Sequence, residues 1–107
     1  MTAPRTGHVA ILMATRNGAE FLRAQLDSLA AQDHDDWSLW IGDDGSTDAT
    51  RAIVEAFAHS HPQRTVSLRD GARRGSMANF LSLLCAPDIR ADFFALADQD
   101  DVWLPVR

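Results

Sequence analysis

Lysine is absent from this sequence of 107 residues, and all ten of its basic residues are arginines. A Walker P-loop uses a lysine to hold the phosphates, and a Schiff-base enzyme needs a lysine amine. Receiver-type phosphoacceptor domains also use a lysine. The sequence therefore excludes these three classes of protein.

Cysteine and long apolar runs are also scarce. The single cysteine, Cys85, cannot form an intramolecular disulfide, which is typical of a protein in a reducing compartment. It follows a leucine-rich segment, so we expect it to pack in or near the core. No apolar run reaches the roughly 20 residues that span a bilayer, and residues 1–7 lack the apolar part of a signal peptide. The sequence predicts a cytoplasmic location and no transmembrane segment.

Positive charge is limited as well. Fifteen acidic residues against ten arginines give a net charge of −5. Nucleic acids and anionic membranes attract a basic protein face, so nucleic acid is not an expected partner. The hydrophobic fraction of 46% and the charged fraction of 23% are those of an ordinary globular domain.

Strand-like and helix-like patterns alternate along the chain. Four hydrophobic stretches predict strands, at residues 9–13, 37–41, 66–68 and 92–97. Apolar residues at helical spacing predict a helix in each interval between them. This alternation implies an α/β fold with a Rossmann-like, doubly wound and mostly parallel sheet. We expect residues 1–7 to be a flexible N-terminus and residues 8–107 to form one domain.

Two details of the helices can be predicted. Ser46 or Thr47 can cap the second helix, because both precede its apolar residues and carry a hydroxyl. In the third helix, four apolar residues at helical spacing predict one buried stripe, formed by Met77, Phe80, Leu81 and Leu84.

Acidic residues follow two of the predicted strands. The segment DQDD at 98–101 places three carboxylates in four residues, which repel one another unless a cation such as Mg²⁺ or Mn²⁺ binds them. The segment DDGS at 43–46 ends the second strand, and TRNG at 15–18 ends the first. Ligands of open α/β sheets bind beyond the carboxyl ends of the strands. The three segments together predict a nucleotide site with a cation at the diphosphate.

Four blocks of the sequence carry a family resemblance: VAILMATRNG at 9–18, QLDSL at 25–29, DDGSTD at 43–48 and DQDDVWLP at 98–105. In this order and spacing the chain resembles the family-2 glycosyltransferases, and it looks closest to their bacterial rhamnosyltransferase-like branch. The resemblance implies the GT-A fold and covers nearly the whole chain from His8 onward.

The resemblance implies a role for each residue of the nucleotide site. Thr15 and Asn17 would lie along the nucleoside, and Asp44, beside Asp43, would accept a hydrogen bond from the pyrimidine N3–H. Arg16 stands where the family commonly has tyrosine; its guanidinium could stack on the base or turn to a phosphate. Arg74, in the pair at 73–74, could hold a phosphate or be an ordinary solvated residue.

The resemblance also implies a metal site. Asp100 would be the direct ligand of Mg²⁺ or Mn²⁺, Asp101 would support it, and Asp98 would face the metal and the ribose or the donor sugar. The reaction would be transfer of a sugar, with inversion, from a UDP- or dTDP-linked donor to a carbohydrate or lipid-linked acceptor.

The family's acceptor-binding half and general base lie downstream of the metal motif, and therefore beyond Arg107. We expect residues 8–107 to supply an incomplete, donor-binding part, with no catalytic residue that can be named. The full enzyme could associate peripherally with the inner face of the membrane.

Two other functions remain open at this point. A non-catalytic nucleotide-binding remnant of a truncated or split gene would share the same donor site, so the residues do not separate it from an enzyme. A nucleotidyltransferase would carry a glycine-rich loop with a lysine or arginine directly after the first strand. Residues 14–18 are too short and too poor in glycine for such a loop.

Overall fold

The computed structural model describes residues 7–31, 36–71 and 75–98 of the protein. Within these ranges, strands and helices alternate as the hydrophobic pattern predicts. In chain order they are β1 (Val9–Thr15), α1 (Ala19–Ala30), β2 (Trp37–Asp43), α2 (Thr50–Ser60), β3 (Thr65–Asp70), α3 (Ser76–Leu84) and β4 (Phe93–Asp98).

The strands form one parallel sheet in the order β3-β2-β1-β4. Every residue of β1 is buried, because β1 lies inside the sheet and both of its faces are covered. In the register, Thr15 is opposite Asp43 and Ala14 is opposite Asp98. The carboxyl ends of β1, β2 and β4 therefore lie at the same edge of the sheet, as predicted.

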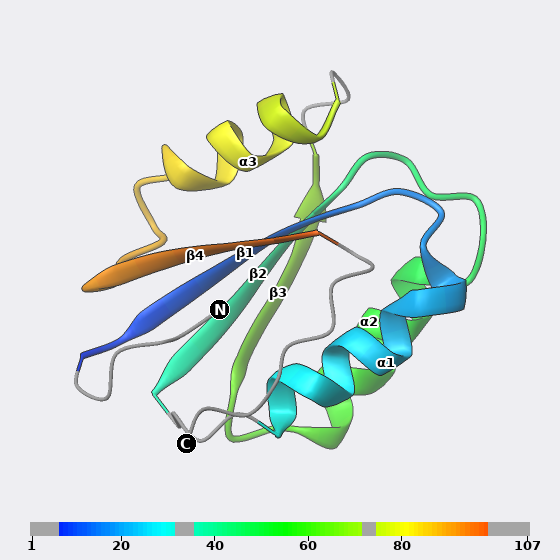
Figure 1. The fold of residues 1–107 in the computed structure, drawn as a ribbon, viewed down its shortest axis with the longest axis horizontal. Helices are drawn as coiled ribbons and strands as arrows, with labels where there is room; N and C mark the ends of the chain where they lie inside the picture. Colours follow the sequence, from blue (N-terminus) through cyan, green and yellow to red (C-terminus); the bar gives the residue numbers. More distant parts are fainter. Residues whose placement is uncertain (1–6, 32–35, 72–74, 99–107) are drawn as a thin grey trace.

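Helices cover both faces of the sheet, with α1 and α2 on one face and α3 on the other (Figure 1). Alternation along β1 builds both cores: Ile11 and Met13 pack with α1 and α2, whereas Leu12 packs with Leu83 of α3. Burying a leucine or isoleucine side chain stabilises the fold by about 1.5–3 kcal/mol. The doubly wound sheet is therefore confirmed.

The cover of the sheet is uneven. In the described ranges, seven large hydrophobic residues are exposed, and six of them belong to α3 or β4: Met77, Leu81, Leu84, Phe93, Phe94 and Leu96. The strand β4 forms one edge of the sheet, and β3 forms the other. The β3 edge is polar, and Arg69 there binds Asp88 with a nitrogen–oxygen distance of 2.9 Å and lies over the Trp40 ring.

The predicted stripe of α3 is largely wrong. Met77, Leu81 and Leu84 are exposed, whereas Asn79 and Leu83 are buried. The nine residues of α3 contain no charged side chain, so apolar residues occur on both faces and their spacing does not determine which face is buried. The expectation for Cys85 is also wrong, because this residue, which follows the last turn of α3, is exposed.

The helix α2 begins later than a cap at Ser46 or Thr47 requires. Its first residue is Thr50, and neither hydroxyl caps it. The Ser46 hydroxyl instead donates to Asp43, and Asp48 Oδ1 accepts from the Thr50 N–H at 2.9 Å. No helix in the described ranges is long and apolar enough to cross a membrane.

Candidate functional site

The loops that follow β1 and β2 meet at the carboxyl edge of the sheet. The Thr15 hydroxyl donates to Asp43 Oδ1 at 2.8 Å. The Asp44 N–H donates to the Thr15 carbonyl oxygen at 2.9 Å, which continues the pairing of β1 with β2 past the end of the strand. These two bonds fix the position of Asp44, which is the first residue of the loop after β2.

Asp43 is fully buried and is surrounded by donors. Besides Thr15, it accepts from the Ser46 N–H at 3.0 Å, from the Ser46 hydroxyl, and from Arg51 Nη1 at 3.2 Å. Burial by itself raises the pKa of Asp43, but the bonds from Ser46, Thr15 and Arg51 outweigh it and hold this pKa below its usual value. Asp43 is therefore a carboxylate that organises the loop from inside the protein.

Arg51 links the ends of two strands. Its Nη1 atom lies 3.2 Å from Asp43 Oδ2 and 3.2 Å from Asp70 Oδ1. Asp43 ends β2 and Asp70 ends β3, so this one side chain of α2 connects both strand ends. The sequence analysis did not identify Arg51, although its position eight residues after Asp43 in a loop–helix segment could have suggested the contact.

Asn17 joins the β1–α1 loop to the β2–α2 loop. Its φ of 49° lies in the left-handed region, which asparagine tolerates better than most residues. Its N–H donates to the Ser46 hydroxyl at 2.8 Å, and its Oδ1 accepts from the Thr47 N–H at 2.8 Å. The Asn17 side-chain oxygen is therefore already engaged by Thr47.

Two further bonds hold the same loops together. The Gly18 N–H donates to the Thr50 hydroxyl at 3.0 Å, and the Ala19 N–H donates to Asp48 Oδ2 at 3.2 Å. The hydrogen bond from the Thr50 hydroxyl is the main reason that the pKa of Asp48 lies below its usual value. The ionised carboxylate of Asp48 thus accepts hydrogen bonds from the first residues of both α1 and α2.

An open pocket of about 260 Å³ lies at these loops and is lined by Arg16, Asp44, Gly45 and Gly75. Its residues come from the β1–α1 loop, the β2–α2 loop and the start of α3. A cation and a carboxylate border the same space. Such a pair can hold a ligand that carries both a negative group and a hydrogen-bond donor.

The other predicted site residues are described only in part. Arg74, Asp100 and Asp101 lie outside the described residues, and for Asp98 only the backbone, at the end of β4, is described. Within the described ranges, no group of three or more His, Cys, Asp and Glu residues is arranged to hold a metal ion.

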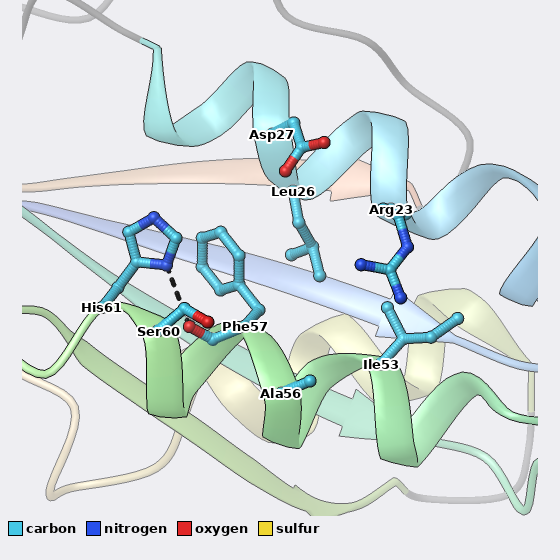
Figure 2. Close-up of a pocket in the computed structure, with 8 residues that line it drawn as sticks. All are labelled: Arg23, Leu26, Asp27, Ile53, Ala56, Phe57, Ser60 and His61. Atoms are coloured by element: carbon cyan, nitrogen blue, oxygen red, sulfur yellow. Dashed lines mark hydrogen bonds between the residues drawn. The ribbon is translucent and has the colours of Figure 1, made fainter.

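A second pocket, of about 100 Å³, lies between α1 and α2 (Figure 2). Arg23 and Asp27 line it from α1. From the α2 side, His61 stacks on Phe57 and its Nδ1 lies 2.9 Å from the Phe57 carbonyl oxygen. It contains none of the predicted site residues, so the pocket at the strand ends is the candidate site.

Comparison with known proteins identifies the family of the chain. The model of glycosyl transferase family 2 matches residues 10–107. The chain belongs to this family. Among curated proteins, this family-2 chain is 36% identical over 94 residues to the dTDP-rhamnosyl transferase RfbG of Shigella flexneri. That match covers 85% of the chain and 32% of the relative.

Solved structures also share the fold of this family-2 chain. The mannosyltransferase PcManGT from Pyrobaculum calidifontis, in complex with GDP-Man and Mn²⁺, aligns with a TM-score of 0.81 and 25% identity. Staphylococcus aureus TarS 1–349, in complex with UDP-GlcNAc, aligns with a TM-score of 0.65 and 27% identity. The alignments cover 91% and 87% of this chain but 28% and 26% of those chains. The chain thus spans about a third or less of its relatives' length.

Proposed function

We propose that residues 8–107 are the donor-binding part of a metal-dependent glycosyltransferase. The complete reaction transfers a sugar, with inversion, from a nucleoside diphosphate to an acceptor hydroxyl. The observation that carries the proposal is the pocket at the strand ends, where Arg16 and Asp44 face a common space in a family-2 chain. Relatives of this fold carry GDP-Man with Mn²⁺ or UDP-GlcNAc.

In this proposal Asp44 accepts the N3–H of a pyrimidine base, and Arg16 stacks on the base or contacts a phosphate. Thr15 and Asn17 border the nucleoside. The side-chain oxygens of Thr15 and Asn17 already bond to Asp43 and Thr47. These two residues therefore shape the side of the nucleoside site and do not bond to the nucleoside through these oxygens. Asp43 holds Thr15 in place through the bond from its hydroxyl, and Arg74 contacts a phosphate.

Asp98, Asp100 and Asp101 would hold Mg²⁺ or Mn²⁺. Carboxylate oxygens are the donors that these hard cations prefer, and Asp98 ends β4 at the same edge of the sheet as Thr15 and Asp43. The bound cation would neutralise charge on the departing diphosphate. This chain's own part is to hold the base and to orient the diphosphate.

The donor is a UDP- or dTDP-linked sugar, and the acceptor is a carbohydrate or a lipid-linked sugar. The similarity to a dTDP-rhamnosyl transferase supports the thymidine donor. Because the chain spans about a third of that relative, we expect it to bind the donor and to transfer little or no sugar by itself. The proposed location is the cytoplasm, with peripheral association of the full enzyme at the inner face of the membrane.

Calorimetric titration with UDP and dTDP, with and without Mn²⁺, tests this function. We expect weak binding that Mn²⁺ strengthens about tenfold or more, a gain of about 1.4 kcal/mol. The variant Asp100→Asn should lose the Mn²⁺ effect, whereas the control Asp88→Asn, which removes an exposed carboxylate paired with Arg69, should keep it. Equal binding by Asp100→Asn and the parent chain would refute the metal assignment. Transfer of sugar by this chain alone would refute the proposal that its active site is incomplete.

A further inference from the structure

Three residues crowd together beneath Asp44. Gly42 lies near the end of β2, Gly71 follows β3 directly, and Asn79 belongs to α3. Asn79 is only 1% exposed, and its Nδ2 donates to the Gly42 carbonyl oxygen at 2.6 Å. The strands β2 and β3 and the helix α3 are thus in contact at the base of the candidate site.

Gly71 leaves space that the Asp44 carboxylate occupies. A Cβ atom added to Gly71 would lie 2.1 Å from Asp44 Oδ1 and 2.8 Å from Asn79 Nδ2, closer than real Cβ atoms approach. The Gly71 N–H also donates to the Asp43 carbonyl oxygen at 2.8 Å, which fixes Gly71 beside the β2 end. The backbone of Gly71 is not left-handed. The space beside Asp44 and Asn79, and not the backbone conformation, therefore favours glycine here.

Gly42 provides a matched contrast. A Cβ atom added there would lie 2.0 Å from Asn79 Oδ1, and the next nearest atoms also belong to Asn79. The two glycines sit at the same junction and both make room for the buried Asn79 amide, but only Gly71 also makes room for the carboxylate of the site. An effect that Gly71→Ala has and Gly42→Ala lacks therefore reports the placement of Asp44.

We propose that Gly71 is a positioning residue that sets the base specificity of the site, by letting the Asp44 carboxylate lie against the end of β3. This inference rests on the proposed function, in which Asp44 accepts the base N–H. Such a bond weakens steeply when its length or angle departs from the favoured values. A methyl group at position 71 forces the carboxylate away from the place that uridine requires.

Uridine and cytidine diphosphates are the right pair of probes, because their bases differ at the edge that Asp44 faces. Uracil presents an N3–H donor, whereas cytosine presents an N3 acceptor that a carboxylate repels. Their affinities in the presence of Mn²⁺ should be measured for the parent chain, Gly71→Ala and Gly42→Ala. A residue with only a structural role would not change their ratio.

We expect the parent chain to prefer UDP at least tenfold, and Gly71→Ala to lose most of this preference through weaker UDP binding. Gly42→Ala should lower the melting temperature but keep the preference. If the parent chain binds neither nucleotide, or both equally, the proposed function itself fails. If the parent discriminates and Gly71→Ala does so equally, or Gly42→Ala loses the preference to the same extent, the role of Gly71 is refuted.

A stability cycle tests the contact even if Gly71→Ala folds poorly. Gly71→Ala should lower the Tm by several degrees when Asp44 is present and by less in an Asp44→Ala background, where the clashing oxygen is gone and only the contact with Asn79 remains. An equal Tm cost in both backgrounds would refute the inference without any nucleotide.

Discussion

Two regions of the molecule differ in how their side chains are satisfied. The loops after β1 and β2 bond their polar groups within the protein, whereas α3 and β4 expose large apolar side chains. In the loops, both carboxylate oxygens of Asp43, and the N–H and side-chain oxygen of Asn17, have partners within the protein. On α3 and β4, large apolar side chains such as Phe94 and Leu96 are 42% and 51% exposed. The polar groups of the loops are therefore held in fixed positions, whereas the α3–β4 side exposes large apolar side chains to solvent.

The largest expected effect is at Asp43. The change Asp43→Asn keeps the size of the side chain but removes the charge and places an amide N–H against the Ser46 N–H or Arg51. We expect a loss of about 2–4 kcal/mol in the free energy of unfolding, measured by urea denaturation. Asp88→Asn, at an exposed ion pair with Arg69, should cost far less, because a solvent-exposed ion pair contributes little to stability. Equal losses would contradict the organising role of Asp43.

The acid side of the stability profile depends on the same residue. Because the pKa of Asp43 is lowered in the folded protein, its contribution to stability is complete above the unfolded pKa of about 3.9 and decreases as pH falls through the folded value. We expect stability to fall below about pH 4, and Asp43→Asn to show a shallower fall. An unchanged slope in the variant would mean that other carboxylates control the acid transition.

Asn17→Ala should have a smaller effect than Asp43→Asn. It removes the acceptor of the Thr47 N–H and places alanine at a φ of 49°, which costs about 1–2 kcal/mol. Asn17→Gly separates the two causes, because glycine relieves the backbone strain but not the lost acceptor. If both variants match the parent in urea denaturation, the side chain of Asn17 does not join the loops.

The smallest effect on stability is expected on the α3–β4 side. Leu96→Lys should change the free energy of unfolding by no more than about 0.5 kcal/mol. It should also reduce concentration-dependent association in sedimentation velocity, because a lysine protects an exposed edge strand. Thr65→Lys, on the exposed end of the opposite edge strand β3, is the control and should leave association unchanged. Equal behaviour of the two variants would remove the contrast between the edges.

The sheet and the edge that holds the candidate site could be predicted from sequence, because a buried parallel strand such as Val9–Thr15 is continuously apolar and polar residues follow it. The family blocks likewise pointed to Asp44. The inward direction of Asp43 was not predicted: adjacent residues of a strand point to opposite sides, and the pattern alone does not say which carboxylate is buried. The orientation of α3 was not predicted either, because no charged residue marks its outer face.

Gly71 and Asn79 could not be found from sequence, since their role depends on three elements that meet only in the folded protein. Their contacts with Asp44 and Gly42 appear as distances between residues 27 to 37 positions apart, and no local pattern encodes them. The bond from Arg51 to Asp70, 19 positions along the chain, likewise depends on the folded arrangement of α2 and β3.

A residue-resolved NMR titration of the chain with UDP and Mg²⁺ tests nucleotide binding at the strand ends most directly. We expect saturable shifts in the amide signals of four residues, and we expect Asp44→Ala to abolish them: Arg16, Asp44, Gly45 and Gly75. Signals of Phe57 and His61, at the pocket between α1 and α2, should stay in place. Saturable shifts at Phe57 and His61 with none at Asp44 would contradict the central claim that the strand ends hold the nucleotide.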